Sequence, residues 1–281
     1  MRSTNPVLRR WERNWDPDPS YDDAPTANDS SEYADTHSPD GGPREATALQ
    51  SRTGAMTTDD VVARTALTLG VVVLAAVLSW VLLPVDPANV ATSYGIAVGA
   101  GLVALVLAVV QSFRPKPLPT LILGYAAFEG VFLGVISSAT SSQLSPGVVV
   151  QAVAGTMAVF AGVLIAYKLR WIRVTRRFHG FVMAAATGFV ILTVADLLFS
   201  AFGSGDGLGF RSGGFGILFG VAGIVLGACF LALHFKHVEE GVKCGVPREE
   251  SWQAAFGLTI TLVWIYVEAL NLLTLFYGDD F

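Results

Sequence analysis

Four ionisable side chains lie within or at the edge of long apolar stretches, where charge is unusual. Glu129 lies in the middle of one stretch, Glu268 lies past the middle of another, and Asp196 lies toward the end of a third. His234 closes a fourth stretch and is followed by Lys236. An isolated charge in hydrocarbon costs at least about 2.5 to 3.5 kcal/mol, so intramembrane ionisable groups typically mark ion or proton pathways. We therefore predict that Glu268, His234, Glu129 and Asp196 form an ion pathway or a pH sensor.

Each of these residues also has a purely structural interpretation. A protonated carboxyl of Glu129 or Glu268 could bond a backbone carbonyl and lock two helices together. Asp196 could reach the outer interface and be solvated there, which we favour for this residue, and His234 could be a hydrated imidazole. A pair of Glu268 and His234 would titrate near neutral pH and could switch a helix bundle between packings. Hairpin geometry argues against a direct pair, because a turn near Gly245 places His234 level with Gly257.

The last apolar stretch, Ser251–Tyr277, is long enough to cross a bilayer as one helix. At about 100° per residue, one narrow face carries Gly257, Thr261, Trp264, Glu268 and Asn271. The opposite face carries Leu262, Tyr266, Leu270 and Leu273. We expect this helix to lie inside a bundle with its polar face toward protein or water. Trp264 and Asn271 would then support Glu268, and Lys236 would support His234.

The composition indicates a membrane protein. Hydrophobic residues make up 52% of the chain, charged residues 15%, and the mean hydropathy is +0.54, whereas soluble domains carry about 25% charge. Seven apolar runs of spanning length are separated by proline- and glycine-rich breakers. They cover about 62–83, 91–113, 119–140, 147–168, 178–202, 213–235 and 251–277. The fold class is therefore all-α, with seven transmembrane helices.

The region before the first run differs from the rest of the chain. Residues 1–55 are polar, acidic and rich in Pro, Ser and Gly, which predicts a disordered tail. Most of the net negative charge lies there, so the formal charge of −5 does not indicate nucleic-acid binding. Thr57 and Asp60 have capping-box spacing and predict a helix start in a domain that covers residues 56–281.

Lysine and arginine alternate between the predicted loops. The loops after spans two, four and six are basic, whereas the other loops hold only Arg211. This bias predicts a cytoplasmic N-terminus and an external C-terminus in the cell (inner or plasma) membrane. Small residues recur at four-residue spacing and predict close helix packing in lipid. The pairs are Gly95/Gly99, Gly130/Gly134, Gly216/Gly220 and Gly223/Gly227.

Several activities do not fit the sequence. No HExxH, GxSxG or P-loop motif is present. The lysines are Lys116, Lys168, Lys236 and Lys243, so the last helix lacks the Schiff-base lysine that a retinal protein needs. We expect a non-enzymatic protein without a resident cofactor. Its contacts are expected to be with lipid and with cations, and Ca²⁺ is a candidate transported ion.

Several motifs resemble the Bax inhibitor / YccA-like family in its bacterial branch. They are NPVLRR near the start, MTTDDVVARTALTLG, FEGVFLGVIS, and the closing EEGVKCGVPREESWQAAFGLTITLVWIYVEALNLL. The resemblance covers most of the chain beyond residue 56. It implies a seventh helix at the centre of two three-helix groups, and a pH-sensitive calcium leak with an acidic pair on helices six and seven.

The chain departs from that family pattern at the presumed sensor. The resemblance places the helix-seven acid at Glu268 and the helix-six acid at or near His234, in a stretch where relatives read Asp-Phe-Asp. Here the stretch reads His234, Phe235, Lys236, which removes negative charge that a calcium site would use. The leading hypothesis is a cation passage gated by protonation around Glu268 and His234. The alternatives are a non-transporting membrane partner of a protease or stress complex and a proton-coupled small-molecule transporter.

Overall fold

The computed structural model describes residues 54–83, 85, 89–172, 174–202 and 213–278. Contacts divide the chain after Arg44, and every described residue belongs to the second unit, Glu45–Phe281. Seven helices in this unit are long and apolar enough to cross a membrane. They are α3 (Thr58–Leu82), α4 (Val90–Ser112), α5 (Pro119–Gln143), α6 (Pro146–Lys168), α7 (Arg176–Phe202), α8 (Gly213–Cys244) and α9 (Ser251–Gly278). A short 3-10 turn, η1 (Arg248–Glu250), precedes α9.

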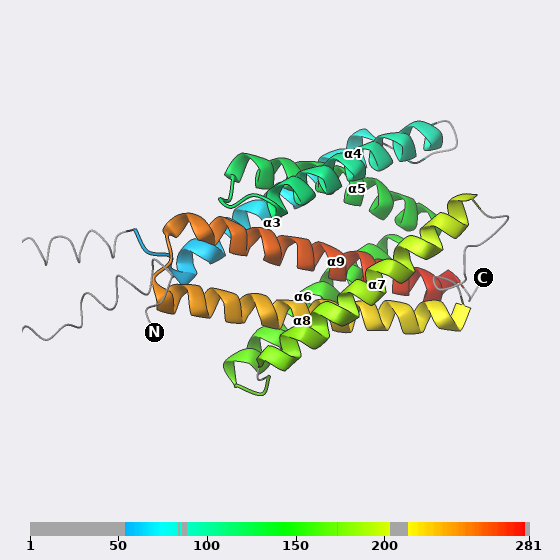
Figure 1. Ribbon diagram of the computed structural model, residues 1–281. Coiled ribbons are helices and arrows are strands. Elements are labelled where there is room, and N and C mark those ends of the chain that lie inside the picture. The colour runs from blue at the N-terminus through cyan, green and yellow to red at the C-terminus, as the bar shows by residue number, and fades with distance from the viewer. Residues whose placement is uncertain (1–53, 84, 86–88, 173, 203–212, 279–281) are drawn as a thin grey trace, which may run out of the picture. The chain divides into compact units, whose positions relative to one another are not determined.

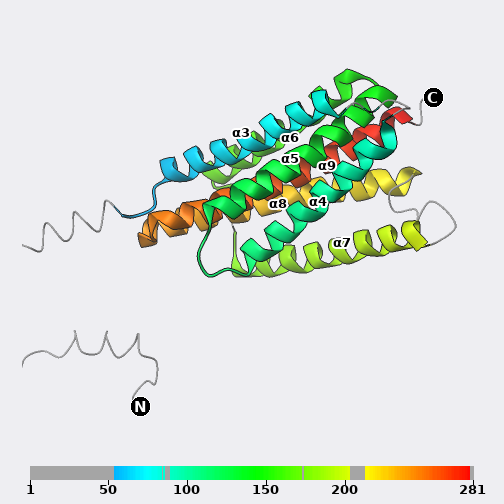
Figure 2. The same ribbon diagram turned by 90° about the horizontal axis from the view of Figure 1, so that it is seen from above.

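Helix α9 is the central element of this unit. It packs against α8, α3, α6 and α5, and half of its most apolar window is buried, the largest share of any span. Helix α5 packs against α3 and α4 on one side, and α8 packs against α6 and α7 on the other. Figures 1 and 2 show α9 between these two three-helix groups. The expected all-α, seven-helix architecture with a central seventh helix is confirmed.

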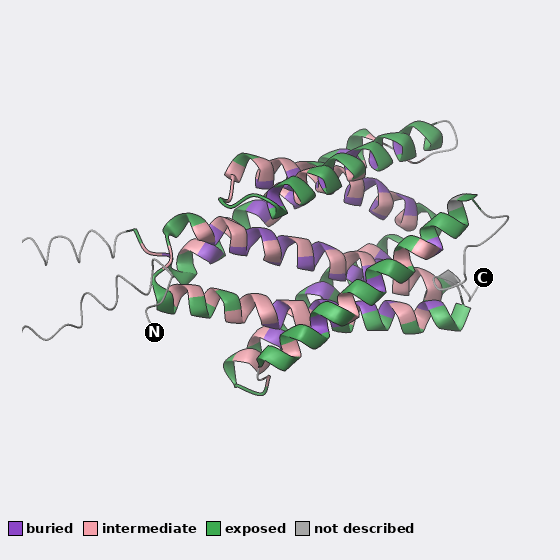
Figure 3. Cartoon of the chain, viewed as in Figure 1, coloured by how far each residue is buried: buried purple, intermediate pink, exposed green. Residues whose placement is uncertain are grey.

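Burial follows this arrangement. Purple and pink residues are concentrated on α9, whereas α7 is green along most of its length (Figure 3). Helix α7 packs mainly on α8 and exposes large apolar side chains such as Phe181, Ile191 and Leu197, which suits lipid contact. Among the seven spans, α7 therefore has the least extensive packing against the rest of the bundle.

The helix bounds agree with the predicted runs except at the end of α8. The apolar run ends near Phe235, but the last residue of the helix is Cys244. The next residue, Gly245, has a φ of +63° and terminates the helix. The extension is polar and carries the i,i+4 ion pairs Lys236–Glu240 and Lys243–Glu239. Lys236 and Lys243, which the sequence places in a loop, therefore lie on a helix that extends past the apolar run.

The predicted glycine pairs Gly130/Gly134 and Gly223/Gly227 mediate close helix contact. A Cβ on Gly134 would lie 2.3 Å from the Ala76 carbonyl oxygen of α3, and a Cβ on Gly227 would lie 2.5 Å from Ile265 Cγ1 of α9. By contrast, a Cβ on Gly95 or Gly99 would meet nothing within 4 Å. The α3–α5 and α8–α9 interfaces thus use glycine for close approach, whereas the pair on α4 has no such role.

The start of the described chain is attached to the turn that precedes α9. Met56 N donates to Val246 O at 2.8 Å, and Arg248 N donates to Gly54 O at 2.8 Å. Arg248 also forms an ion pair with Asp60 at 2.7 Å, and the Thr57–Asp60 capping box is present as predicted. Gly54 and Ala55, assigned to the tail from composition, are therefore paired with this turn; the rest of the predicted disordered tail lies outside the described residues.

Candidate functional site

Glu268 lies in the interface between α9 and α8. Its side chain is 4% exposed. The position of a Cβ on Gly223 would be 3.0 Å from both Glu268 Cδ and Phe189 Cζ, so the carboxyl lies over a glycine of α8 and beside a ring of α7. The absence of a side chain at position 223 creates the space that the carboxyl occupies. As predicted, the acidic face of the last helix points toward protein.

Aromatic rings cover Glu268 on the side of α7 and α8. Trp264, one turn before Glu268, donates from Nε1 to the Gly223 carbonyl oxygen at 3.3 Å. Its ring lies 5.3 Å from that of Phe189, which stacks on Phe219 at 4.2 Å. These rings make the surroundings of the carboxyl apolar, while Trp264 fixes the glycine backbone against it. The predicted supporting role of Trp264 rests on this contact.

Asn271 follows Glu268 by three residues on the same face of α9. Its Nδ2 is buried and has no hydrogen-bond partner among the described residues. A buried amide donor normally pairs with an acceptor or with an ordered water. The C-terminal side of Glu268 along α9 therefore presents a donor that suits water or an anionic oxygen.

His234 lies in the same α8–α9 interface but at a different level. Its Nε2 is 3.1 Å from Thr261 Oγ1, and the position of a Cβ on Gly257 would be 2.5 Å from its Cε1. The imidazole thus lies on Gly257, as the hairpin geometry predicts. It is partly buried, whereas His237 is exposed.

Glu268 and His234 do not form a direct pair. Thr261 and Gly257 precede Glu268 by seven and eleven residues, which at 1.5 Å per residue corresponds to about 10 and 16 Å along the axis. Helix α9 begins at Ser251, so the late start that direct contact would need is absent from this helix. The interface instead holds two titratable groups at separate levels, each beside a glycine of the facing helix.

Glu129 and Asp196 lie on two other helices, α5 and α7. Glu129 is partly buried on α5, one turn after Tyr125, whose ring lies edge-on to Phe256 of α9 at 5.4 Å. Asp196 is 7% exposed on α7, so the solvated interpretation of this residue is wrong.

Lys236 points away from this interface. Its Nζ donates to the Val174 carbonyl oxygen at 2.8 Å and lies 3.3 Å from Glu240. It therefore ties the α6–α7 connection to the end of α8. Within the described ranges, His, Cys, Asp and Glu form no group of three that could hold a metal ion. The described residues thus offer single ionisable groups rather than a multidentate calcium site.

Comparison with known protein families matches residues 5–278 to the family described as Bax inhibitor 1 like. This match spans nearly the entire chain, tail included. The chain belongs to the Bax inhibitor 1 like family. A comparison with curated proteins found no match.

Sequence reasoning missed the hydroxyl contacts on the other faces of α9. Thr68 and Thr259 pair through their hydroxyls at 2.7 Å, and both are fully buried. Ser137 Oγ lies 2.6 Å from Tyr266 OH. Neither pair has a sequence signal, because hydroxyl residues are common in membrane helices and their partners lie far apart in the chain. These contacts hold α9 to α3 and α5 without any charge.

Proposed function

We propose that this Bax inhibitor 1 like protein is a pH-sensitive cation leak protein without enzymatic activity, and that Glu268 is its gating group. The observation that carries the proposal is the burial of this carboxyl between α8 and α9, over Gly223. A carboxyl buried in hydrocarbon is stable when neutral, and its ionised form needs water or a cation. Ionisation of Glu268 would therefore favour separation of α8 from α9 and entry of a cation.

His234 would act at the cytoplasmic level of the same interface. When protonated, it adds a positive charge beside Gly257 and Thr261, which opposes the passage of cations. Protonation of Glu268 and protonation of His234 therefore act in the same direction. We expect cation flux to be larger at pH 8 than at pH 6.

The test is calcium flux into proteoliposomes that contain a calcium-sensitive dye, measured at pH 6 and pH 8. Glu268→Gln keeps the size of the side chain and removes its charge. We expect this variant to lower the flux at pH 8 and to remove most of the pH dependence. Glu240→Gln is the matched control, since Glu240 is exposed on the polar end of α8. Flux that is absent at both pH values in the wild type and in Glu268→Gln would contradict the proposal.

We propose that the protein lies in the inner or plasma membrane with a cytoplasmic N-terminus and an external C-terminus. The basic loops support this orientation. The exposed Cys244 offers a direct test, because it lies at the end of α8 that this orientation places in the cytoplasm. In a Cys229→Ser background, a membrane-impermeant maleimide should label inverted vesicles and not right-side-out vesicles. The reverse result would invert the proposed orientation.

The alternative function is that of a non-transporting membrane partner of a protease or stress complex. The pairing of Gly54 and Met56 with the turn before α9 supports it, since a partner bound to the N-terminal region would act on the central helix directly. This alternative predicts no flux and a partner that is lost when residues 1–53 are deleted.

A further inference from the structure

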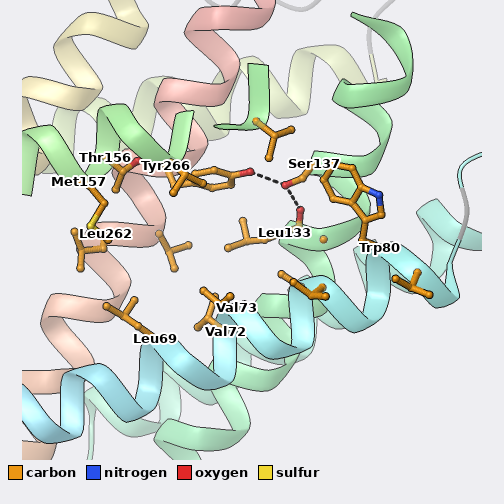
Figure 4. Close-up of a pocket in the computed structure, with 17 residues that line it drawn as sticks. Leu69, Val72, Val73, Trp80, Leu133, Ser137, Thr156, Met157, Leu262 and Tyr266 are labelled. Carbon is orange, nitrogen blue, oxygen red and sulfur yellow. Dashed lines mark hydrogen bonds between the residues drawn. The ribbon is translucent and has the colours of Figure 1, made fainter. Parts of the chain in front are cut away.

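A groove of about 480 Å³ lies on the side of α9 that is opposite to Glu268. Its walls are α3 and α6, and its floor is formed by α5 and α9 (Figure 4). The volume lies within the range of about 300 to 1,000 Å³ that is typical of ligand pockets. Neither the gating proposal nor the hydroxyl contacts of α9 account for this space.

The mouth of the groove opens to the surroundings of the bundle. Helices α3 and α6 do not pack extensively on each other within the described ranges. Both rims carry exposed apolar residues: Val73 and Val81 on α3 are 60% and 71% exposed, and Met157 on α6 is 50% exposed. Because both helices are apolar along spanning lengths, this mouth faces hydrocarbon in a membrane.

The shape of the groove suits an elongated occupant. Its lining on α3 runs from Leu69 to Val81, which is about 18 Å of helix at 1.5 Å per residue. The groove therefore runs along the spans, as an extended hydrocarbon chain of a bilayer lipid does.

The chemistry of the lining narrows the choice further. No charged side chain lines the groove, so a free fatty acid would have no partner for its carboxylate. Its floor carries the hydroxyl pair of Ser137 and Tyr266, and Ser137 also donates to Leu133 O at 2.6 Å. A phospholipid keeps its charged head at the interface and inserts only an acyl chain, which such a lining suits.

We propose that the groove is a binding site for one acyl chain of a bilayer phospholipid. The chain fills the space between α3 and α6 and packs on Leu133, Leu262 and the ring of Tyr266. It thereby supports α9 on the face away from Glu268. The site is independent of cation passage, so its test does not depend on the proposed gate.

The test uses phosphatidylcholine with a spin label on its acyl chain and measures the immobilised lipid component in proteoliposomes by electron paramagnetic resonance. Val153→Trp and Val73→Trp fill the groove from its two walls, since both residues line it. Val150→Trp and Leu74→Trp are the matched controls, because these residues are exposed on the same helices and outside the lining. We expect each groove variant to lose about one immobilised chain per protein, and the controls to keep it.

Trp80 provides a second readout that needs no groove-filling variant. Trp80 lines the groove on α3, so phosphatidylcholine with brominated acyl chains should quench its fluorescence. The fluorescence of Trp80 is obtained as the difference between the wild type and Trp80→Phe. Equal loss of immobilised lipid in groove and control variants would overturn the proposal. So would an unquenched Trp80, or immobilisation of spin-labelled stearic acid without immobilisation of the labelled phospholipid.

Discussion

The two sides of α9 are built from different chemistry. Toward α8, the helix presents Glu268 and contacts His234, and glycines of both helices make room for these side chains. Toward α3 and α5, it presents Thr259 and Tyr266, which pair with neutral hydroxyls. Hydroxyl pairs hold helices together without responding to pH, whereas ionisable groups respond to it. Under the proposed function, proton-dependent behaviour therefore belongs to the α8 side, and the other side gives α9 constant support.

The strongest test of this comparison is a pair of flux measurements on two residues within one turn of α9, Glu268 and Tyr266. Ionised Glu268 offsets a charge penalty of at least about 2.5 kcal/mol for a cation in hydrocarbon, so Glu268→Gln should lower calcium flux at pH 8 more than roughly tenfold. Tyr266→Phe removes only a hydroxyl on the other side and should leave flux unchanged. Equal losses in both variants would break the distinction between the two sides.

The next test concerns the glycine contacts of the α8 side. Gly227→Leu forces a side chain against the fully buried Ile265 and should lower the free energy of unfolding by about 1 to 3 kcal/mol. Gly188→Leu is the control, because a Cβ there meets nothing within 4 Å. Unfolding in mixed detergent micelles, followed by circular dichroism, measures both. Similar stability losses in the two variants would show that glycine packing on α8 is not special.

A smaller effect is expected on the hydroxyl side. Thr259→Val removes the buried pair with Thr68, and hydroxyl contacts between membrane helices contribute on average about 0.6 kcal/mol, with a maximum near 1.7. Thr68 keeps its bond to Thr65 O at 3.0 Å, which limits the loss. A double-mutant cycle with Thr68→Val isolates the contribution of the pair. A coupling free energy between Thr68 and Thr259 that is larger than the loss of unfolding free energy in Gly227→Leu would reverse the ranking of the two sides.

The smallest expected effect is the coupling free energy between His234 and Glu268, the two titratable groups on the α8 side. The levels of His234 and Glu268 are about 10 Å or more apart, and residues at such distances are usually additive within about 0.5 kcal/mol. The unfolding free energies of Glu268→Gln, His234→Gln and the double variant should therefore be additive. A coupling of several times that size would indicate that the two side chains meet, as a direct latch requires.

The sequence predicts the architecture well, because bilayer thickness imposes a length and a composition on every span. It also predicts which face of α9 carries Glu268 and that His234 lies at Gly257, since both follow from helical periodicity and the turn at Gly245. These features are local or nearly local in the chain.

The remaining features depend on long-range packing, which periodicity does not encode. Helix α8 extends beyond Phe235 through a polar segment that contains the ion pairs Lys236–Glu240 and Lys243–Glu239. Low hydropathy predicts a loop for this segment. The burial of Asp196 depends on how the neighbouring segments pack against α7. The groove exists because α3 and α6 leave a space between them, and no single helix carries a signal for that space.

The attachment of Gly54 and Met56 to the turn before α9 has a consequence for the preparation of the protein. A shortened chain that begins at residue 58 retains every apolar span but loses the backbone hydrogen bonds from Gly54 and Met56, and with them the capping hydroxyl of Thr57. Expression trials that trim the N-terminus should therefore stop before position 54. A cut only a few residues later would remove the two backbone hydrogen bonds that join the segment before the first span to the turn before the central one.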